Sequence, residues 1–375
     1  MMKTVLYIGG FEMPDKNAAA QRVLSIAKAF SVCGYSVSFR GVTKDRDYKG
    51  VVEGFHYEAV DYPRSTSDWI QYAIGVSATE CISRIKPKIV ILYNYPAVAQ
   101  ERVLRYCKKR GIGVVGDITE WYGSKSLLKK IDVWLRMNWS NRHLDGIISI
   151  SRLLYRYYEK NNSVLIPPLV DMTEEKWIKP IDSDDHQIDA QHGKVRLVYA
   201  GSPSGTKDRL DYVIHGIKNV EKGSLSLDVI GITQSQYHDI YGADSELDAS
   251  LIRFLGRLPH KDAVSHLRKA DFQVFFRDDD RTNNAGFPTK FVEATSAGIP
   301  VITNRISNIA DYLKSGVNGF MIEDLSLASI DGVLKAVSIL SRKEINDMKK
   351  QIDSHAFDYH NYVDTIRSFV EGICQ

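Results

Sequence analysis

Several features are scarce or absent in this 375-residue sequence, and each absence narrows the possible functions. The net charge is only +3 at neutral pH, so the chain as a whole offers no cationic surface typical of nucleic-acid binding. No apolar run reaches the ~18 residues that a membrane span needs, and the chain enters its first strand without a signal-peptide core. We therefore expect a cytoplasmic protein, attached at most peripherally to the inner face of a membrane.

Metal-binding and redox motifs are also missing. The four cysteines, Cys33, Cys81, Cys107 and Cys374, form no C-x-x-C pair, which indicates reduced thiols rather than a zinc or thioredoxin-type site. The ten histidines show no ligand spacing either. We expect no metal and no cofactor other than a substrate.

What the sequence does contain is an alternation of short apolar segments with longer helical patterns, which predicts parallel sheets covered by helices. A polar stretch at 172–194 indicates a linker between an N-terminal domain, 1–171, and a C-terminal domain, 195–358. A helical pattern at 359–375 is expected to return to the first domain. In such doubly wound domains ligands bind beyond the carboxyl ends of the strands, so we expect the site in a cleft between the domains. Strands are predicted at 5–8, 36–39, 88–93, 112–115, 146–150, 164–166, 195–200, 225–230, 252–255, 272–276, 300–303 and 319–322, and a helix at 18–32.

The most informative motif is the run from Ala285 to Glu293. Pro288 suits the start of a helix, which places Lys290 in the first turn, where the helix dipole disfavours a cation. A lysine there is explained if an anion binds at the free N–H groups of the helix, and Glu293, one turn on, can accept hydrogen bonds from a ribose diol. A surface Lys–Glu pair is the simpler alternative.

A second motif follows the strand at 195–200. Gly201, Ser202 and Lys207 belong to a glycine-containing loop that can bring N–H groups and an ammonium to a phosphate, although the P-loop spacing is absent. An ordinary strand-to-helix turn is the alternative. Two lysines near helix starts, both beyond carboxyl ends of second-domain strands, together favour a joint diphosphate site.

These motifs carry a resemblance to the retaining glycosyltransferases of family four, which have the GT-B fold of two Rossmann-like domains. Gly201 with Lys207, the run 286–293, and the segments 298–303 and 318–320 resemble the family, as do 149–151 and 166–171 less specifically. The resemblance implies that Lys207 contacts the diphosphate of a UDP- or GDP-linked sugar donor and that Glu293 holds its ribose. The other residues that it places near the donor are Gly9, Gly10, Gly201, Ser202, Arg277, Phe287, Pro288, Thr289 and Lys290.

Two positions depart from the family pattern. Ala285 replaces a common glutamate and Ser202 a common arginine, and Arg277 or Arg281 can supply the missing positive charge. Asp278, Asp279 and Asp280 match the D-x-D metal motif of a different glycosyltransferase fold, but a solvated charged loop is the interpretation we favour.

In the first domain, Asp117 and Glu120 follow the strand at 112–115 and are expected to face the cleft. With Lys290 they are the candidate catalytic residues, placed to contact the donor sugar or to orient the acceptor hydroxyl. A helix-capping role is the alternative for either acid.

The segment from Lys125 to Arg142 is basic and aromatic, with an apolar stripe of Leu127, Leu128, Ile131 and Leu135. Such a helix can lie on an anionic bilayer, or its stripe can cover the core of the domain.

The expected function is transfer of a sugar from a nucleotide diphosphate sugar to an acceptor hydroxyl with retention, in polysaccharide or glycoconjugate synthesis. The acceptor would be a glycan, a lipid-linked molecule or a protein. The alternatives are a non-catalytic partner subunit and a nucleotide-sugar epimerase.

Overall fold

The computed structural model describes residues 3–14, 16–45, 48–124, 126–178, 194–203, 207–221, 223–242 and 247–373. Lys125, Cys374, residues 179–193 of the expected linker, and residues 204–206 of the loop after Gly201 lie outside the described residues.

The chain divides into two compact units. The first unit comprises Met1–Asp171, Asn284–Phe287 and Asp358–Gln375, and the second comprises Met172–Asn283 and Pro288–Phe357. Within the expected linker, the short helix α7 (Glu175–Ile178) is grouped with the second unit.

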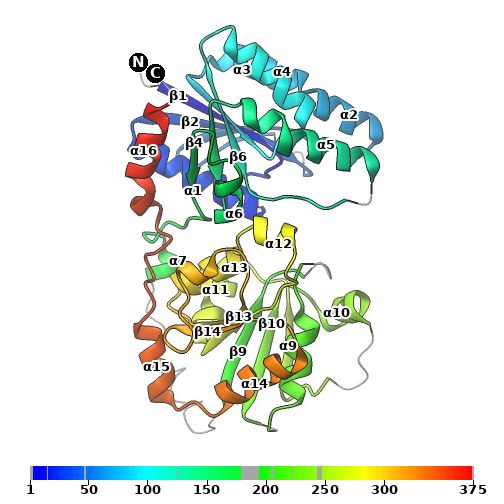
Figure 1. Cartoon of the computed structure of the whole chain (residues 1–375), viewed down its shortest axis with the longest axis vertical. Coiled ribbons are helices and arrows are strands. Elements are labelled where there is room, and N and C mark those ends of the chain that lie inside the picture. Colours follow the sequence, from blue (N-terminus) through cyan, green and yellow to red (C-terminus); the bar gives the residue numbers. More distant parts are fainter. Residues whose placement is uncertain are drawn as a thin grey trace. The chain divides into compact units, whose positions relative to one another are not determined.

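The first unit is built on a sheet with the order β3-β4-β2-β1-β5-β6-β7-β8. Figure 1 labels β1, β2, β4 and β6 of this sheet. Every pairing is parallel except that of β3 with β4. The strands are β1 (Lys3–Gly9), β2 (Tyr35–Thr43), β3 (Lys49–Val52), β4 (Phe55–Asp61), β5 (Ile89–Tyr93), β6 (Gly113–Ile118), β7 (Gly146–Ser149) and β8 (Ser163–Leu165).

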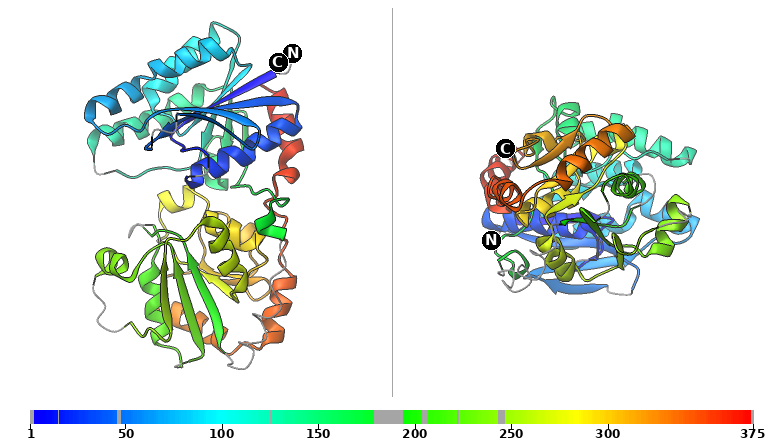
Figure 2. Two further views of the ribbon diagram at one scale, coloured as in Figure 1. Left: turned by 180° about the vertical axis from the view of Figure 1, so that it is seen from behind. Right: turned by 90° about the horizontal axis from the view of Figure 1, so that it is seen from below.

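Helices cover both faces of this sheet, because alternate residues of its central strands are apolar on both sides. Val5 and Tyr7 pack with the helices α1 and α16, whereas Leu6 and Ile8 pack on the opposite face with α3 and α4. Figure 2 shows α1 and α16 next to each other, so the C-terminal helix belongs to the core of the first unit. The helices are α1 (Ala18–Val32), α2 (Thr66–Ile74), α3 (Val76–Ile85), α4 (Ala97–Lys108), α5 (Leu127–Asn138), η1 (Ser140–His143), α6 (Arg152–Tyr157), η3 (Tyr359–Tyr362) and α16 (Val363–Glu371).

The second unit has a sheet that is parallel throughout, with the order β11-β10-β9-β12-β13-β14. Its strands are β9 (Val195–Ala200), β10 (Leu225–Ile230), β11 (Ile252–Gly256), β12 (Phe272–Val274), β13 (Val301–Asn304) and β14 (Gly319–Ile322). Its helices besides α7 are α9 (Leu210–Lys218), α10 (Gln234–Tyr241), α11 (His260–Lys269), α13 (Thr289–Ser296), η2 (Ile309–Asp311), α14 (Leu327–Ser338) and α15 (Arg342–Lys350), and α12 (Arg281–Ala285) ends in the stretch grouped with the first unit.

The expected fold class is confirmed, since both units are helix-covered parallel sheets. The sequence prediction missed β3 and β4, whose hairpin forms the only antiparallel pairing among the described strands. Among the described cysteines, Cys81 and Cys107 are buried and Cys33 is half-buried, all three as free thiols.

Candidate functional site

The first turn of α13 lies where its sequence predicts. Pro288 precedes the helix with φ −69°, an angle that its ring imposes, and Lys290 is the second helical residue. The Lys290 side chain is 6% exposed, so its ammonium is a buried cation at a helix N-terminus. A cation there requires an anion nearby.

That anion is the carboxylate of Asp208, which sequence reasoning did not identify. Lys290 Nζ lies 2.7 Å from Asp208 Oδ2, and Arg277 Nε donates to Oδ1 at 2.7 Å. The Tyr199 hydroxyl donates to Oδ2 at 2.8 Å. We call these four residues, Asp208, Lys290, Arg277 and Tyr199, the Asp208 cluster. A protein carboxylate therefore accounts for Lys290, where the sequence suggested either a bound anion or a surface pair with Glu293.

The cluster contains two cations and one anion in a buried setting. Burial alone would raise the pKa of the Asp208 carboxyl, but the neighbouring charges of Lys290 and Arg277 lower this pKa well below its ordinary value. Burial lowers the pKa of the Lys290 ammonium, and the charge of Asp208 opposes that change. The ammonium also lies 4.0 Å from the centroid of the Tyr199 ring. The cluster thus retains a positive charge that its own carboxylate does not cancel.

The loop after β9 brings backbone close to the same lysine. Gly201 has φ +144°, and a Cβ placed on it would lie 3.0 Å from Lys290 Nζ. Gly231 directly follows β10, and a Cβ on it would lie 2.1 Å from the Gly201 carbonyl oxygen. Glycine is therefore needed at the ends of both β9 and β10. Ser202 is exposed, and its hydroxyl donates to the Gly231 carbonyl at 3.4 Å.

Lys207 differs in position from its prediction. α9 begins only at Leu210, so Lys207 lies in the loop before the helix and not in its first turn. Its side chain is half-buried and it directly precedes Asp208.

Glu293 lies on α13 one turn after Lys290 and is partly exposed. Its Oε1 lies 3.2 Å from Nε2 of His260, the first residue of α11, with side-chain exposures of 24% and 29%. Glu293 is therefore oriented by a neighbouring helix, while both side chains still reach solvent.

The loop between β12 and α13 is fixed by hydrogen bonds of its own. The side chain of Asn304 accepts from the Arg277 N–H and donates to the Arg277 carbonyl, both at 2.9 Å. Asp278 pairs with Arg209 at 3.1 Å, and Asp280 accepts from the Asn283 N–H. These two acids therefore hold the loop, in agreement with the interpretation of a charged loop.

The remaining residues of the motif are mostly enclosed. Ala285, Phe287 and Pro288 are buried, and Thr289 is half-buried. Phe287 thus contributes to packing, and Thr289 is the more accessible of the predicted contacts in this run.

In the first unit, the two glycines after β1 have different surroundings. A Cβ on Gly9 would lie 2.6 Å from Tyr93 Cβ, so this glycine is required by the approach of β5. Gly10 is exposed, and a Cβ there would meet nothing closer than the Tyr72 hydroxyl at 3.8 Å. Packing explains Gly9, whereas it does not explain Gly10.

Asp117 lies near the carboxyl end of β6 but is enclosed, which argues against its prediction as a catalytic residue. It is the fifth residue of β6 and is 0% exposed. Arg22 of α1 donates to its carboxylate from NH2 at 2.7 Å and from Nε, and the Tyr7 hydroxyl donates at 2.5 Å. Arg22 also donates to the carbonyls of Ile166 and Pro167, both at 3.0 Å. Both oxygens are used internally, so Asp117 acts as a structural residue.

Glu120 lies two residues beyond β6 and is half-buried. The N-cap of α5 is Ser126, so neither Glu120 nor Asp117 is a helix cap. Burial raises the pKa of the neighbouring Tyr122, and the charge of Glu120 raises it further. Glu120 is thus the accessible acid of the pair at the carboxyl end of β6.

Part of the chain is similar to known glycosyltransferases. Residues 194–338 match the family model described as "Glycosyl transferases group 1". This segment is therefore similar to a group 1 glycosyl transferase domain. A D-inositol 3-phosphate glycosyltransferase of Geodermatophilus obscurus is 26% identical over 118 residues, which cover 32% of this chain and 25% of that relative.

Solved structures of the same fold match nearly the whole chain. Anabaena HepE in complex with UDP and glucose has a TM-score of 0.70 at 12% identity and covers 98% of this chain and 99% of its own. The catalytic domain of Arabidopsis starch synthase IV, bound to ADP and acarbose, has a TM-score of 0.71 at 11% identity, with 100% of both chains covered. The chain therefore has the GT-B fold.

Within residues 194–338, the sequence analysis missed Asp208, Tyr199, Gly231 and His260. Asp208 stands beside Lys207 in the predicted loop, but its partner Lys290 is 82 residues away. His260 lies outside both motifs of this domain. Nothing local marks either residue as part of the site.

The described residues contain a single group of acids close enough to share a metal ion, namely Glu53, Asp171 and Glu174. Lys28 lies 2.5 Å from Glu53 and 2.7 Å from Asp171, so an ammonium already pairs with two of the three acids. In the part of the chain that the structure describes, no helix is both long and apolar enough to cross a membrane.

Proposed function

We propose that this protein is a retaining hexosyltransferase, which moves a sugar from a UDP- or GDP-linked donor to an acceptor hydroxyl in polysaccharide or glycoconjugate synthesis. The GT-B fold and the group 1 domain support the reaction class. Among the structures with this fold, one is a complex with UDP-glucose and another holds ADP, which supports a nucleotide-linked donor.

The observation that carries the proposal is the Asp208 cluster. It joins residues at the carboxyl ends of β9 and β12 with the first turn of α13, the edge of a parallel sheet where ligands bind. Its two cations and the N–H groups of α13 supply positive potential in a buried setting, where electrostatic interactions are strong. A diphosphate leaving group is the anion that such a site stabilises.

In the proposed reaction the bond between the anomeric carbon and the diphosphate oxygen breaks, and a bond from that carbon to the acceptor oxygen forms on the same face. The acceptor proton passes to the departing phosphate, so no protein nucleophile is needed. Lys290, Arg277 and Lys207 stabilise the diphosphate, and Asp208 positions the first two. Glu293 accepts hydrogen bonds from the ribose.

The first unit contributes the acceptor side in this proposal. Gly10 lets backbone approach the donor, and Glu120 orients the acceptor hydroxyl. Asp117 pairs with Arg22 inside the unit, which makes it a structural residue and not a catalytic one.

Calorimetry with UDP, GDP, ADP and their glucose conjugates tests the donor assignment. Glu293→Gln should weaken binding of the preferred nucleotide by about 1.5–3 kcal/mol, the value of a hydrogen bond to a charged group. Glu323→Gln is the matched control, since Glu323 is an exposed acid paired with Arg305. Equal affinities for the wild type and Glu293→Gln would remove Glu293 from the site.

Product analysis separates the reaction classes. Transfer to an acceptor with an unchanged anomeric configuration supports the proposal. A changed sugar formed without acceptor indicates an epimerase, and nucleotide binding without turnover indicates a non-catalytic subunit.

A further inference from the structure

The apolar stripe of α5 does not cover the core of the first unit. Of its four residues, Leu127 is 70% exposed, Leu128 78% and Ile131 47%, and Leu135 is half-buried. Trp134 of the same helix is 62% exposed. The helix buries Arg136 and Met137 instead, on its opposite side. Of the two interpretations that the sequence left open, a stripe packed in the core is therefore wrong, and the exposed stripe needs another explanation.

A second helix extends this apolar surface. Trp69 and Ile70 of α2 are 41% and 55% exposed, and Lys129 Nζ of α5 lies 5.5 Å from the centroid of the Trp69 ring. Figures 1 and 2 both show α2 and α5 on the same side of the first unit. We call Trp69, Ile70, Leu127, Leu128, Ile131 and Trp134 the α2–α5 face. Soluble monomers rarely expose so many large apolar side chains together.

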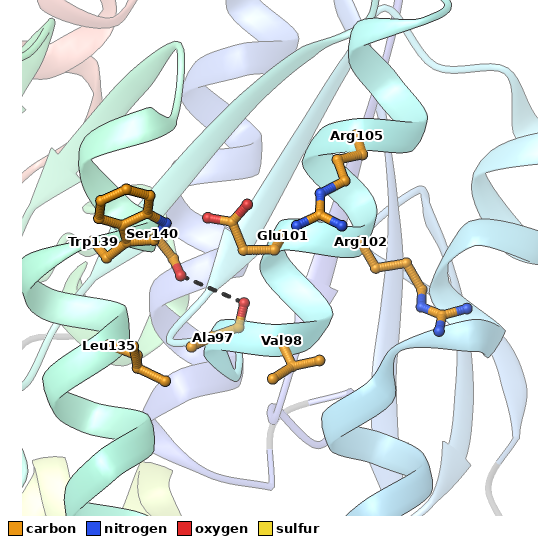
Figure 3. Close-up of a pocket in the computed structure, with 8 residues that line it drawn as sticks. All are labelled: Ala97, Val98, Glu101, Arg102, Arg105, Leu135, Trp139 and Ser140. Atoms are coloured by element: carbon orange, nitrogen blue, oxygen red, sulfur yellow. Dashed lines mark hydrogen bonds between the residues drawn. The ribbon is translucent and has the colours of Figure 1, made fainter.

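A groove of about 470 Å³ lies beside this face, between α4 and α5 (Figure 3). Val98 and Trp139, each 57% exposed, form apolar parts of its wall. Arg102 and Arg105 project from the α4 side and are exposed. The groove therefore combines an apolar wall with cationic side chains.

The exposed charges around the face are mainly cationic, apart from Asp68 of α2, whose carboxylate accepts from the Ser65 N–H at 2.9 Å. Lys129 and Lys130 are interleaved with the apolar residues of α5, and both are exposed. The acid of this helix, Asp132, is half-buried and accepts from the Ala97 N–H at 2.9 Å, which caps α4. Glu101 in the groove is partly buried, with Oε1 3.7 Å from His143 Nδ1.

We propose that the α2–α5 face docks onto an anionic phospholipid bilayer, with Arg102 and Arg105 binding lipid headgroups. Exposed Leu and Ile side chains enter the acyl boundary, tryptophan suits the interfacial level, and lysines contact anionic headgroups. Protein interfaces, in contrast, are depleted of lysine near their apolar centre. The alternation of lysine with apolar residues on α5 therefore favours a bilayer over a protein partner.

The location of the face suits the proposed transfer, and this one point rests on the proposed function. α4 follows β5 and α5 follows β6, so both helices begin at the carboxyl edge of the sheet, where Glu120 lies. A docked bilayer would hold a lipid-linked acceptor near that edge. The docking itself does not depend on any transfer.

Co-sedimentation tests the docking directly. The full chain should bind vesicles of equal parts phosphatidylcholine and phosphatidylserine, and bind pure phosphatidylcholine vesicles much more weakly. The difference should shrink as salt is added, because exposed charges are screened within ~10 Å at 0.1 M. Absence of binding to the anionic vesicles at low salt would overturn the proposal.

Variants distinguish this face from the rest of the surface. Leu128→Ser combined with Trp134→Ser should weaken vesicle binding by about tenfold or more, since the buried apolar area supplies much of the affinity. Val32→Ser combined with Ile339→Ser is the matched control, because these side chains are 52% and 83% exposed at the carboxyl ends of α1 and α14. The control should bind vesicles as the wild type does.

Two further measurements keep the outcomes separate. Nucleotide affinity should be the same in all these variants. A failure of vesicle binding therefore contradicts only the docking, and a failure of nucleotide binding contradicts only the proposed function. Equal vesicle binding by the face variant and the control would overturn the proposal. Concentration-dependent self-association in light scattering that the face variant abolishes would also overturn it, since the face would then bind a second copy of the chain.

Discussion

The two units each contain a buried carboxylate in a similar setting, and the two differ in charge balance. In the first unit, Asp117 accepts from Arg22 and from the Tyr7 hydroxyl. In the second, Asp208 contacts Lys290 and Arg277 and accepts from Tyr199. Both tyrosines belong to the first strand of their unit, two residues before a glycine at its carboxyl end, namely Gly9 and Gly201.

Arg22 and Asp117 balance each other. Arg22 directs its donors to the carboxylate and to two backbone carbonyls, and the side chains of the pair are 3% and 0% exposed. The Asp208 cluster instead has two cations for one carboxylate. A balanced, enclosed pair stabilises the fold, whereas an excess cation beside a helix N-terminus attracts an anion. The comparison teaches that charge balance, more than burial, separates the structural cluster from the candidate binding cluster.

The largest expected effect is on the stability of the first unit. Asp117→Asn leaves the Arg22 guanidinium buried without its counter-charge, which should cost about 3–5 kcal/mol of unfolding free energy. Urea unfolding measures this loss. Asp364→Asn is the control, because Asp364 forms an exposed pair with Arg367 and should leave stability unchanged. Wild-type stability of Asp117→Asn would mean that the pair is not structural.

Asp208→Asn should cost about 3 kcal/mol at neutral pH, because Lys290 and Arg277 then repel each other. The folded-state pKa of Asp208 lies below its unfolded value of about 4, so its stabilising contribution is complete above that pH and declines as pH falls further. The difference between wild type and variant should therefore shrink in urea titrations below about pH 4.

A ligand sharpens this comparison. A saturating nucleoside diphosphate should restore part of the stability of Asp208→Asn, because its phosphates supply the missing anion, and should restore none in Asp117→Asn. Equal recovery in both variants would show that the two clusters do not differ as proposed.

Lys290→Ala has a smaller expected effect, on affinity. It should weaken binding of the nucleoside diphosphate by about 1.5–3 kcal/mol, the value of a charged hydrogen bond, and weaken nucleoside binding much less. Lys207→Ala should act in the same direction. Calorimetry with both ligands checks this, and equal losses for the two ligands would mean that the lysines act only through structure.

Much of the fold follows from local patterns in the sequence. The bounds of α1 and β14 coincide with their predictions, because apolar periodicity and the glycines at their ends define them. β3 was missed because it is a four-residue edge strand with only one partner, β4. Short edge strands bury little and therefore leave a weak pattern.

The candidate site is less predictable, because its residues meet over long separations. Arg22 and Asp117 are 95 residues apart, and the sequence shows each residue but not its partner. The sequence of α5 reveals an apolar stripe but not the direction that the stripe faces. That direction is set by Arg136 and Met137, which the unit buries in place of the stripe.

The smallest expected effects on stability come from substituting Tyr7 and Tyr199. The two substitutions compare the clusters most directly, because each removes one hydroxyl that donates to the carboxylate. Burial raises the pKa of both Tyr7 and Tyr199 well above the ordinary value, so both hydroxyls stay protonated and donate to their carboxylates. Tyr7→Phe and Tyr199→Phe should each lower stability by about 1 kcal/mol, the net value of one hydrogen bond. Only Tyr199→Phe should also change nucleotide affinity, because Asp208 then holds Lys290 less firmly. Thermal unfolding and calorimetry on both variants check this pair, and a change in nucleotide affinity of the same size in Tyr7→Phe would remove the functional distinction between the two clusters.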